Sequence, residues 1–181
     1  MFELLTQWRI IIEDFLKSNI QPLSKDILVA DIGYGDSTFI LRNAFPQLEI
    51  IDSGQKPKDL KIHQLNICDD IPVNLCSHYN LVCCCETLEH TKQPFIAAQN
   101  ILKLTKPNGI ILISVPCHIF YHAMLPFCDD YWRFFESSIP LLFPNNCQIL
   151  QVNSHYNNLT KQTYDMPIGI TATLQKIGGE T

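Results

Sequence analysis

The chain has 181 residues, of which 46% are hydrophobic and 17% charged, and a formal net charge of −5. This length suits one globular domain with a sizeable core, which we place over residues 1–181. The acidic balance and the lack of a Lys/Arg run disfavour a nucleic-acid binder. No apolar stretch reaches the roughly 18 residues of a membrane span, and Glu3, Arg9 and Glu13 interrupt any signal peptide. We therefore expect a cytoplasmic protein with a small-molecule substrate; no oligomeric state is predicted.

The N-terminal elements predict a helix followed by a strand-loop-helix unit. Apolar residues at helical spacing indicate an amphipathic helix over Phe2–Leu16, within a segment 1–20 that we expect to pack on the edge of a sheet. The apolar run Asp26–Ile32 predicts a strand that ends in a glycine-containing loop. Ser37–Ala44 then predicts a helix that ends near Pro46.

The same alternation continues along the chain. Further strands are predicted at Leu48–Ile51, Lys61–Asn66, Tyr79–Cys84 and Gly109–Val115, with a helix over Phe95–Leu104. Two late strands, near Cys147–Asn153 and Ile168–Gln175, are expected to close the sheet as an antiparallel pair. The pattern predicts an α/β fold: a Rossmann-like, doubly wound, mostly parallel seven-stranded sheet with an antiparallel final strand and helices on both faces.

The cysteine pattern predicts buried, reduced thiols. None of the eight cysteines forms a Cys-x-x-Cys pair, and Cys83, Cys84 and Cys85 are adjacent inside an apolar run. Such cysteines behave as small hydrophobic residues. We predict neither a disulfide framework nor a metal site.

The loop after the first strand indicates a ligand site. In open parallel sheets, ligands bind beyond the carboxyl ends of the strands. Gly33 and Gly35 suit a sharp turn that a ligand approaches closely, although many strand-to-helix turns use glycine for steric reasons alone. Asp52 closes the next apolar run, where a carboxylate can accept both hydroxyls of a ribose. Together, these features favour a ligand that contains adenosine.

The residues around this loop favour S-adenosylmethionine (SAM) over a dinucleotide. A dinucleotide fingerprint has a third glycine where this chain has Thr38. Asp31, just before the loop, suits the ammonium and sulfonium charges of SAM, whereas it would add nothing favourable beside a pyrophosphate. An NAD(P)-dependent oxidoreductase is therefore the less favoured alternative.

From about Asp26 to Phe135 the sequence resembles the class I SAM-dependent methyltransferases, in particular the type 11 and type 23 groups, which act mostly on small molecules. The resemblance rests on motifs that occur in the family's order. They are the loop Asp31–Ser37, the acid Asp52, the segment Leu65–Pro72, the strand and turn Tyr79–His90, the helix, turn and strand Leu102–Pro116, and the segment Asp130–Phe134.

The resemblance implies a set of cofactor-binding residues: Asp31, Gly33, Tyr34, Gly35, Asp52, Ser53, Asn66, Ile67 and Cys85. Three positions depart from the family pattern. Ser37 replaces a glycine of the first motif, and Asn66 and Asn80 replace carboxylates. These departures keep a catalytically inactive SAM-binding domain as the alternative to an active enzyme that methylates a small-molecule or glycan/lipid-type acceptor.

Candidate catalytic residues follow the fourth and fifth strands, whose carboxyl ends share one edge of the sheet. A His or carboxylate within hydrogen-bond reach can take a proton from an acceptor. The candidates are His90, His118 and His122, and the resemblance places His90 and His122 near the substrate. A structural role is the alternative for each of them.

An aromatic segment, residues 117–136, is predicted to form a flap on the substrate side. The resemblance implies that Glu89, Tyr131, Trp132 and Arg133 contact substrate. The aromatic side chains suit a wall, and the guanidinium of Arg133 suits an anionic group. Alternatively, the segment packs over the core and Arg133 pairs with Asp129 or Asp130.

Overall fold

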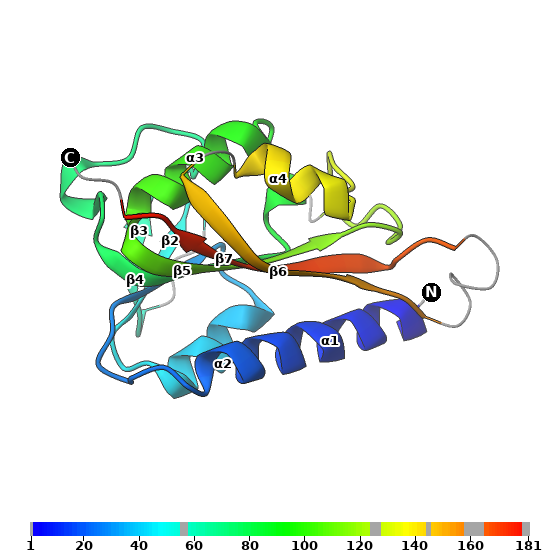
Figure 1. The fold of residues 1–181 in the computed structure, drawn as a ribbon, viewed down its shortest axis with the longest axis horizontal. Coiled ribbons are helices and arrows are strands. Elements are labelled where there is room, and N and C mark those ends of the chain that lie inside the picture. Colours follow the sequence, from blue (N-terminus) through cyan, green and yellow to red (C-terminus); the bar gives the residue numbers. More distant parts are fainter. Residues whose placement is uncertain (1, 55–57, 124–127, 144–145, 158–164, 179–181) are drawn as a thin grey trace.

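The computed structural model describes residues 2–54, 58–123, 128–143, 146–157 and 165–178. These residues form seven strands with helices between them (Figure 1). In chain order the elements are α1 Phe2–Ile20, β1 Val29–Ile32, α2 Asp36–Ala44, β2 Leu48–Asp52, β3 Lys61–Gln64, η1 Val73–Leu75, β4 Tyr79–Cys85, η2 Leu88–His90, α3 Pro94–Leu104, β5 Thr105–Pro116, η3 Glu136–Ser138, α4 Ile139–Leu142, β6 Cys147–His155 and β7 Gly169–Lys176.

The strands form one mixed sheet in the order β3-β2-β1-β4-β5-β7-β6. The pairs β2–β3, β1–β2, β1–β4 and β4–β5 are parallel, and β7 runs antiparallel to both β5 and β6. Helices α1 and α2 lie on one face, and α3 and α4 lie on the other (Figure 1). The predicted doubly wound sheet with an antiparallel final strand is confirmed.

The central strands are mostly apolar because both faces of the sheet are covered. All four residues of β1 are buried, and so are six of the seven in β4. The run Cys83–Cys85 is part of β4, and all eight cysteines are free thiols. The prediction that the cysteines of this run are buried is therefore confirmed.

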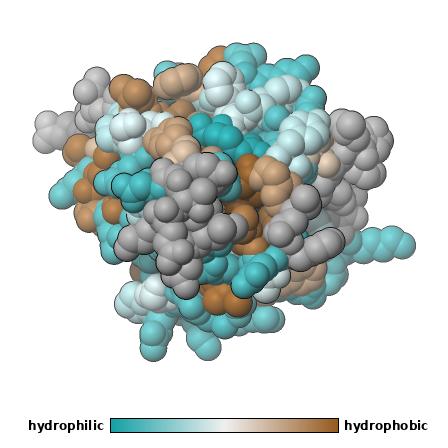
Figure 2. Space-filling view, turned by 90° about the vertical axis from the view of Figure 1, so that its right-hand side faces the viewer, coloured by the Kyte–Doolittle hydropathy of each residue, from teal (hydrophilic) through white to brown (hydrophobic). Residues whose placement is uncertain are grey.

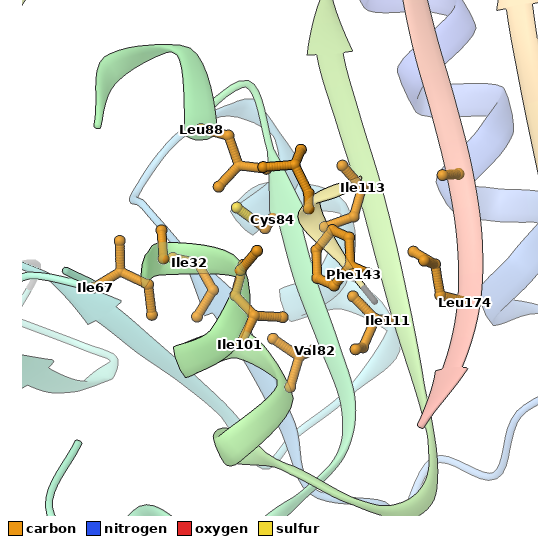
Figure 3. Packing of buried hydrophobic residues seen from close by; sticks show 14 of the residues in the cluster. Ile32, Ile67, Val82, Cys84, Leu88, Ile101, Ile111, Ile113, Phe143 and Leu174 are labelled. Carbon is orange, nitrogen blue, oxygen red and sulfur yellow. The ribbon is translucent and has the colours of Figure 1, made fainter. Parts of the chain in front are cut away.

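Each face of the sheet has its own hydrophobic core. On the α3 side, Ile101 and Phe143 pack with residues of β4, β5 and β7, such as Val82 and Ile111 (Figure 3). On the opposite side, residues of α1 and α2 cover the sheet, with Trp8 and Leu41 almost completely buried. The sheet is packed between the two cores, which fix the positions of the strand ends.

Helix α1 crosses a face of the sheet, so the expectation that it packs on the sheet edge was wrong. The Trp8 ring lies against Gly169 of β7, and the Thr173 hydroxyl of β7 donates to the Asn19 side chain at 3.0 Å. Strand β7 is an inner strand because β6 pairs on its far side. The helix also continues to Ile20, four residues past its predicted end.

Strand β5 begins at Thr105, four residues before its predicted start. The register with β4 shifts between Tyr79 and Leu81, which is a bulge-like irregularity. Asn108 takes up this irregularity with a left-handed φ of 62°, a conformation that asparagine tolerates better than most residues. Pro107 and Asn108 therefore lie inside the strand, although their residue types predict a turn.

Among the described residues, no helix combines the length and the apolar character that crossing a bilayer requires.

The contact between α1 and β7 can be tested at Gly169. A Cβ atom there would overlap the buried Trp8 ring, and overpacking of this kind costs about 2 kcal/mol. We expect Gly169→Ala to lower the free energy of unfolding by about that amount in urea titrations. Gly178→Ala is the control, because its Cβ would meet only the flexible Asn108 side chain. Equal stability of both variants and the wild type would contradict this packing.

Candidate cofactor and catalytic site

The candidate site lies where the strand order reverses, between β1 and β4. The carboxyl ends of these parallel strands share one edge of the sheet, and their following helices, α2 and α3, lie on opposite faces (Figure 1). Ligands of open α/β sheets bind at such reversal points. Figure 2 views this end of the molecule, where polar and apolar surface lie side by side.

Thr87 joins the two strand ends. Its hydroxyl donates to the Ile32 carbonyl at 2.8 Å, and Gly33, the next residue, has a φ of +85°. A Cβ atom on Gly33 would lie 2.7 Å from the Thr87 hydroxyl oxygen. Glycine at residue 33 is therefore required both by the backbone conformation and by the close packing of the turn after β4.

Gly35 has a different role. It precedes α2 with an extended φ of −161°, which any residue can adopt. No atom lies within 4 Å of the place where its Cβ would be. The backbone of this loop is therefore open on that side, as close approach by a ligand requires.

Asp31 lies at the end of β1 beneath this loop and is completely buried. The Thr38 hydroxyl donates to its carboxylate at 2.6 Å, and the Ser37 hydroxyl lies 3.1 and 3.2 Å from the two carboxylate oxygens. Burial raises the pKa of Asp31 to about 7, although the hydrogen bonds from Thr38 and Ser37 act to lower it. Ser37, the departure from the family's glycine, thus points inward to Asp31.

Asp52 closes β2 on the other side of the loop. Its carboxylate accepts the backbone N–H groups of Tyr34 at 3.0 Å and Gly54 at 2.7 Å. These two contacts orient the Asp52 carboxylate beside the glycine loop. Ser53, also predicted to bind the cofactor, follows directly and is exposed.

The remaining predicted cofactor residues differ in exposure. Asn66 is exposed after β3, and its side-chain oxygen accepts the Cys68 N–H at 2.9 Å. Ile67 and Cys85 are buried, with exposed fractions of 6% and 9%. The structure places all of these residues at the carboxyl edge of the sheet.

Asn80 does not belong to the site, so its replacement of a family carboxylate does not bear on cofactor binding. It lies near the amino end of β4, the end away from the glycine loop. Its side-chain oxygen accepts the Leu28 N–H at 3.2 Å and the Lys106 ammonium at 3.1 Å. Asn80 therefore links neighbouring strands. The resemblance alone did not separate this structural role from a role in the site.

The structure brings Glu89, His90 and His122 together. One carboxylate oxygen of Glu89, Oε1, lies 3.8 Å from Nε2 of each histidine, and the two imidazole rings are 5.1 Å apart. Glu89 is completely buried, and neither of its carboxylate oxygens has a hydrogen-bond partner among the described residues. The nearby Glu89 carboxylate raises the pKa of His122. His118, the third candidate histidine, is outside this group.

Arg133 pairs with Asp130, the second of the two predicted alternatives. Two of its N–H groups donate to the two Asp130 carboxylate oxygens, each at 2.6 Å. Its others donate to the carbonyls of Ile119, Phe120 and Trp132. A guanidinium has five N–H donors, so Arg133 has none left for an anionic substrate.

Tyr131 and Trp132, the other two flap residues predicted to contact substrate, are accessible. Tyr131 and Trp132 have exposed fractions of 43% and 40%. The backbone N–H of Tyr131 donates to the Glu89 carbonyl at 2.8 Å, and the Trp132 indole donates to the Thr91 carbonyl at 2.8 Å. The flap is thus fastened to the turn after β4. Residues 124–127 of the predicted flap lie outside the described residues.

Glu86 is a residue of this edge that the sequence analysis missed. It directly follows β4 and accepts the Trp8 indole N–H at 2.7 Å and the Ser114 hydroxyl at 3.2 Å. Burial, followed by the charge of Glu89, raises the pKa of Glu86 well above its usual range. Its position three residues before Glu89 was the available sequence signal.

The burial of Asp31 predicts a pH dependence of stability. Its folded-state pKa of about 7 lies above the ordinary value of 3.8, so the folded state holds the proton more tightly and its stability falls as pH rises between these values. We expect the unfolding free energy of the wild type, relative to Asp31→Asn, to fall by about 3 kcal/mol from pH 5 to pH 8. Urea titrations at several pH values measure this, and parallel curves would contradict it.

Comparison with known proteins defines the family. Residues 7–158 match the type 23 family model, which describes a methyltransferase domain. A search of curated proteins gave no match. Among solved structures, a SAM-dependent methyltransferase from Mesorhizobium loti aligns with a TM-score of 0.62 and 8% identity, over 89% of this chain and 98% of that chain.

Two further structures show how widely the fold is used. The 1,6-didemethyltoxoflavin-N1-methyltransferase of Burkholderia thailandensis, with 1,6-didemethyltoxoflavin and S-adenosylhomocysteine bound, aligns with a TM-score of 0.59 and 14% identity, over 92% of this chain and 76% of that chain. A Rhodobacter sphaeroides structure described as a Zn-dependent alcohol dehydrogenase aligns with a TM-score of 0.66 and 13% identity, over 91% and 88%. Such identities establish the fold alone.

The family match therefore decides between a methyltransferase and an oxidoreductase. It covers most of the chain and agrees with the ordered motifs of the sequence. The chain belongs to the SAM-dependent methyltransferase domain family of type 23, and SAM is its cofactor.

Proposed function

We propose that this enzyme methylates an oxygen or nitrogen atom of a small-molecule or glycan/lipid-type acceptor, and that the attacking atom carries a proton which must be removed. The observation that supports this proposal is the group of Glu89, His90 and His122 at the edge where the cofactor loop lies. Glu89 is only two residues from Thr87, which contacts the loop at Ile32 and Gly33.

The loop residues fit the cofactor. The open side of Gly35 allows close approach to the backbone, the Asp52 carboxylate is oriented beside the loop where a ribose would lie, and the buried Asp31 carboxylate favours a cationic methionine end. When bound, SAM supplies a methyl group already activated by the sulfonium. The protein then has to align the acceptor with that methyl group and to exclude water.

The two histidines are arranged to act on the acceptor's proton. Nδ1 of His90 lies 2.6 Å from the Asp129 carbonyl, and Nδ1 of His122 lies 3.1 Å from the Phe120 carbonyl. A carbonyl only accepts, so each Nδ1 carries the hydrogen and each Nε2 has a free lone pair. The raised pKa of His122 makes it a stronger base than an ordinary imidazole.

The flap supports an acceptor with an apolar or ring-shaped part. Tyr131 and Trp132 offer aromatic surface next to the histidines, and aromatic side chains stack well on rings and sugar faces. Every N–H donor of Arg133 already has an acceptor within the chain. We therefore do not propose that Arg133 binds a carboxylate or phosphate of the substrate.

The cofactor site can be tested with a matched pair of glycine variants. We expect Gly35→Ala to change the unfolding free energy by less than about 1 kcal/mol and to weaken S-adenosylhomocysteine binding by at least about 10-fold, because the methyl group enters the ligand's space. Gly33→Ala should instead destabilise the fold by about 2 kcal/mol through its strained φ. Calorimetry and urea titration measure both quantities; unchanged affinity in Gly35→Ala would place the cofactor elsewhere.

The role of the histidines can be tested through turnover. With radiolabelled SAM and a panel of hydroxylated sugars, phenols and lipids, we expect His122→Gln to lower kcat by about 100-fold and to leave S-adenosylhomocysteine affinity unchanged. His78→Gln, at the amino end of β4, is the control. SAM binding without turnover on any acceptor would favour the inactive-domain alternative. Equal kcat values in His122→Gln and the wild type would refute the proposed proton transfer.

A further inference from the structure

The carboxylate of Glu89 is the least compensated polar group of the described residues. It has no exposed surface, and neither oxygen accepts a hydrogen bond. Its nearest potential partners are the two histidine Nε2 atoms, at 3.8 Å from Oε1. Burying a carboxylate without a partner is costly, so this position calls for a positive charge between the carboxylate and the imidazoles.

The histidines are oriented as ligands of such a charge. Since both Nδ1 atoms face carbonyl oxygens, both Nε2 lone pairs are turned toward Glu89. One ligand atom from each of the three residues lies within 4.8 Å of the other two. Bonds of about 2.1 Å to a shared ion bring ligand atoms to within about 4.2 Å of one another, which requires only small side-chain rotations.

We propose that Glu89, His90 and His122 bind a divalent first-row transition metal ion. Two imidazoles and one carboxylate suit ions such as Mn²⁺, Fe²⁺, Co²⁺ or Zn²⁺ better than Mg²⁺ or Ca²⁺, which prefer oxygen ligands throughout. Three protein ligands leave coordination positions open, which is typical of catalytic rather than structural sites.

The Asp129–Arg133 segment provides the outer shell of this site. The Asp129 carbonyl holds His90. The Asp130 carboxylate accepts the His122 backbone N–H at 2.8 Å and lies 3.2 Å from its Nδ1, while Arg133 fixes Asp130 through both oxygens. Metal-binding histidines normally have such a carbonyl or carboxylate on the second ring nitrogen. The role of this segment is therefore to orient the two histidines, and not to contact substrate through Arg133.

The metal ion would add a catalytic role to the proposed function. That role rests on the proposed function, whereas binding of the ion does not. With a metal ion bound, both imidazoles would be its ligands, and the ion would take over the proton-removing role that the histidines have without it. It would supply Lewis-acid chemistry, which would lower the pKa of an acceptor hydroxyl so that its proton passes to solvent. The hydroxyl oxygen would then form the new bond to carbon as the carbon–sulfur bond of SAM breaks, which leaves S-adenosylhomocysteine with a neutral sulfur.

The site can be tested on the full chain without an affinity tag, after EDTA treatment and dialysis. We expect Mn²⁺ and Co²⁺ each to bind with one equivalent in calorimetry and to raise Tm. Glu89→Gln, His90→Gln and His122→Gln should each weaken binding by at least about 100-fold, and Asp130→Asn by about 10-fold. His78→Gln should bind like the wild type. His122 is partly exposed, so its variant should fold even if a Glu89 variant does not.

Three results would overturn the proposal. They are the absence of saturable binding, binding that survives in His122→Gln, and an intense near-ultraviolet thiolate band with Co²⁺, which would locate the ion on cysteines. These titrations need neither SAM nor an acceptor, so they can succeed or fail independently of the methyl-transfer assay.

Discussion

The reversal of strand order between β1 and β4 is the constraint on which the site depends. It sends the chain to opposite faces of the sheet after two adjacent strands, so the loop at Gly33 and the turn at Thr87 diverge from a common edge. The Thr87 hydroxyl bridges them through the Ile32 carbonyl. Because Gly33 has no side chain, the loop at Gly33 and the turn at Thr87 are in contact.

The sequence was sufficient to predict the sheet, because the patterns that mark its strands are local. Apolar runs of strand length, separated by helices, predicted all seven strands to within a few residues, and the glycine loop was located by its own residues. Errors arose where tertiary contacts decide. The bulge that brings Pro107 and Asn108 into β5 depends on pairing with β4. Likewise, α1 covers a face because β6 adds outside β7.

The site was predictable as a set of motifs but not as an arrangement. Glu89 and His90 are adjacent in a short motif, whereas His122 is more than thirty residues away and joins them only when the flap folds back. The partner of Arg133 was left open because neighbouring acids, Asp129 and Asp130, were equally plausible in sequence. Distances resolve that choice, since the guanidinium engages Asp130 with both arms. No metal-ligand spacing marks the group, because its members come from two separate segments.

Three carboxylates near the strand reversal, two of them completely buried, explain why this edge should attract cations. Asp31 is compensated by the hydroxyls of Ser37 and Thr38, and Glu86 by an indole and a hydroxyl, whereas Glu89 has no donor among the described residues. Neutral donors stabilise a carboxylate less than a charge does. The positive charge of the cofactor therefore compensates the negative charge of Asp31, and a metal ion would compensate that of Glu89. Binding of both would compensate the negative charges of Asp31 and Glu89 at one edge of the sheet.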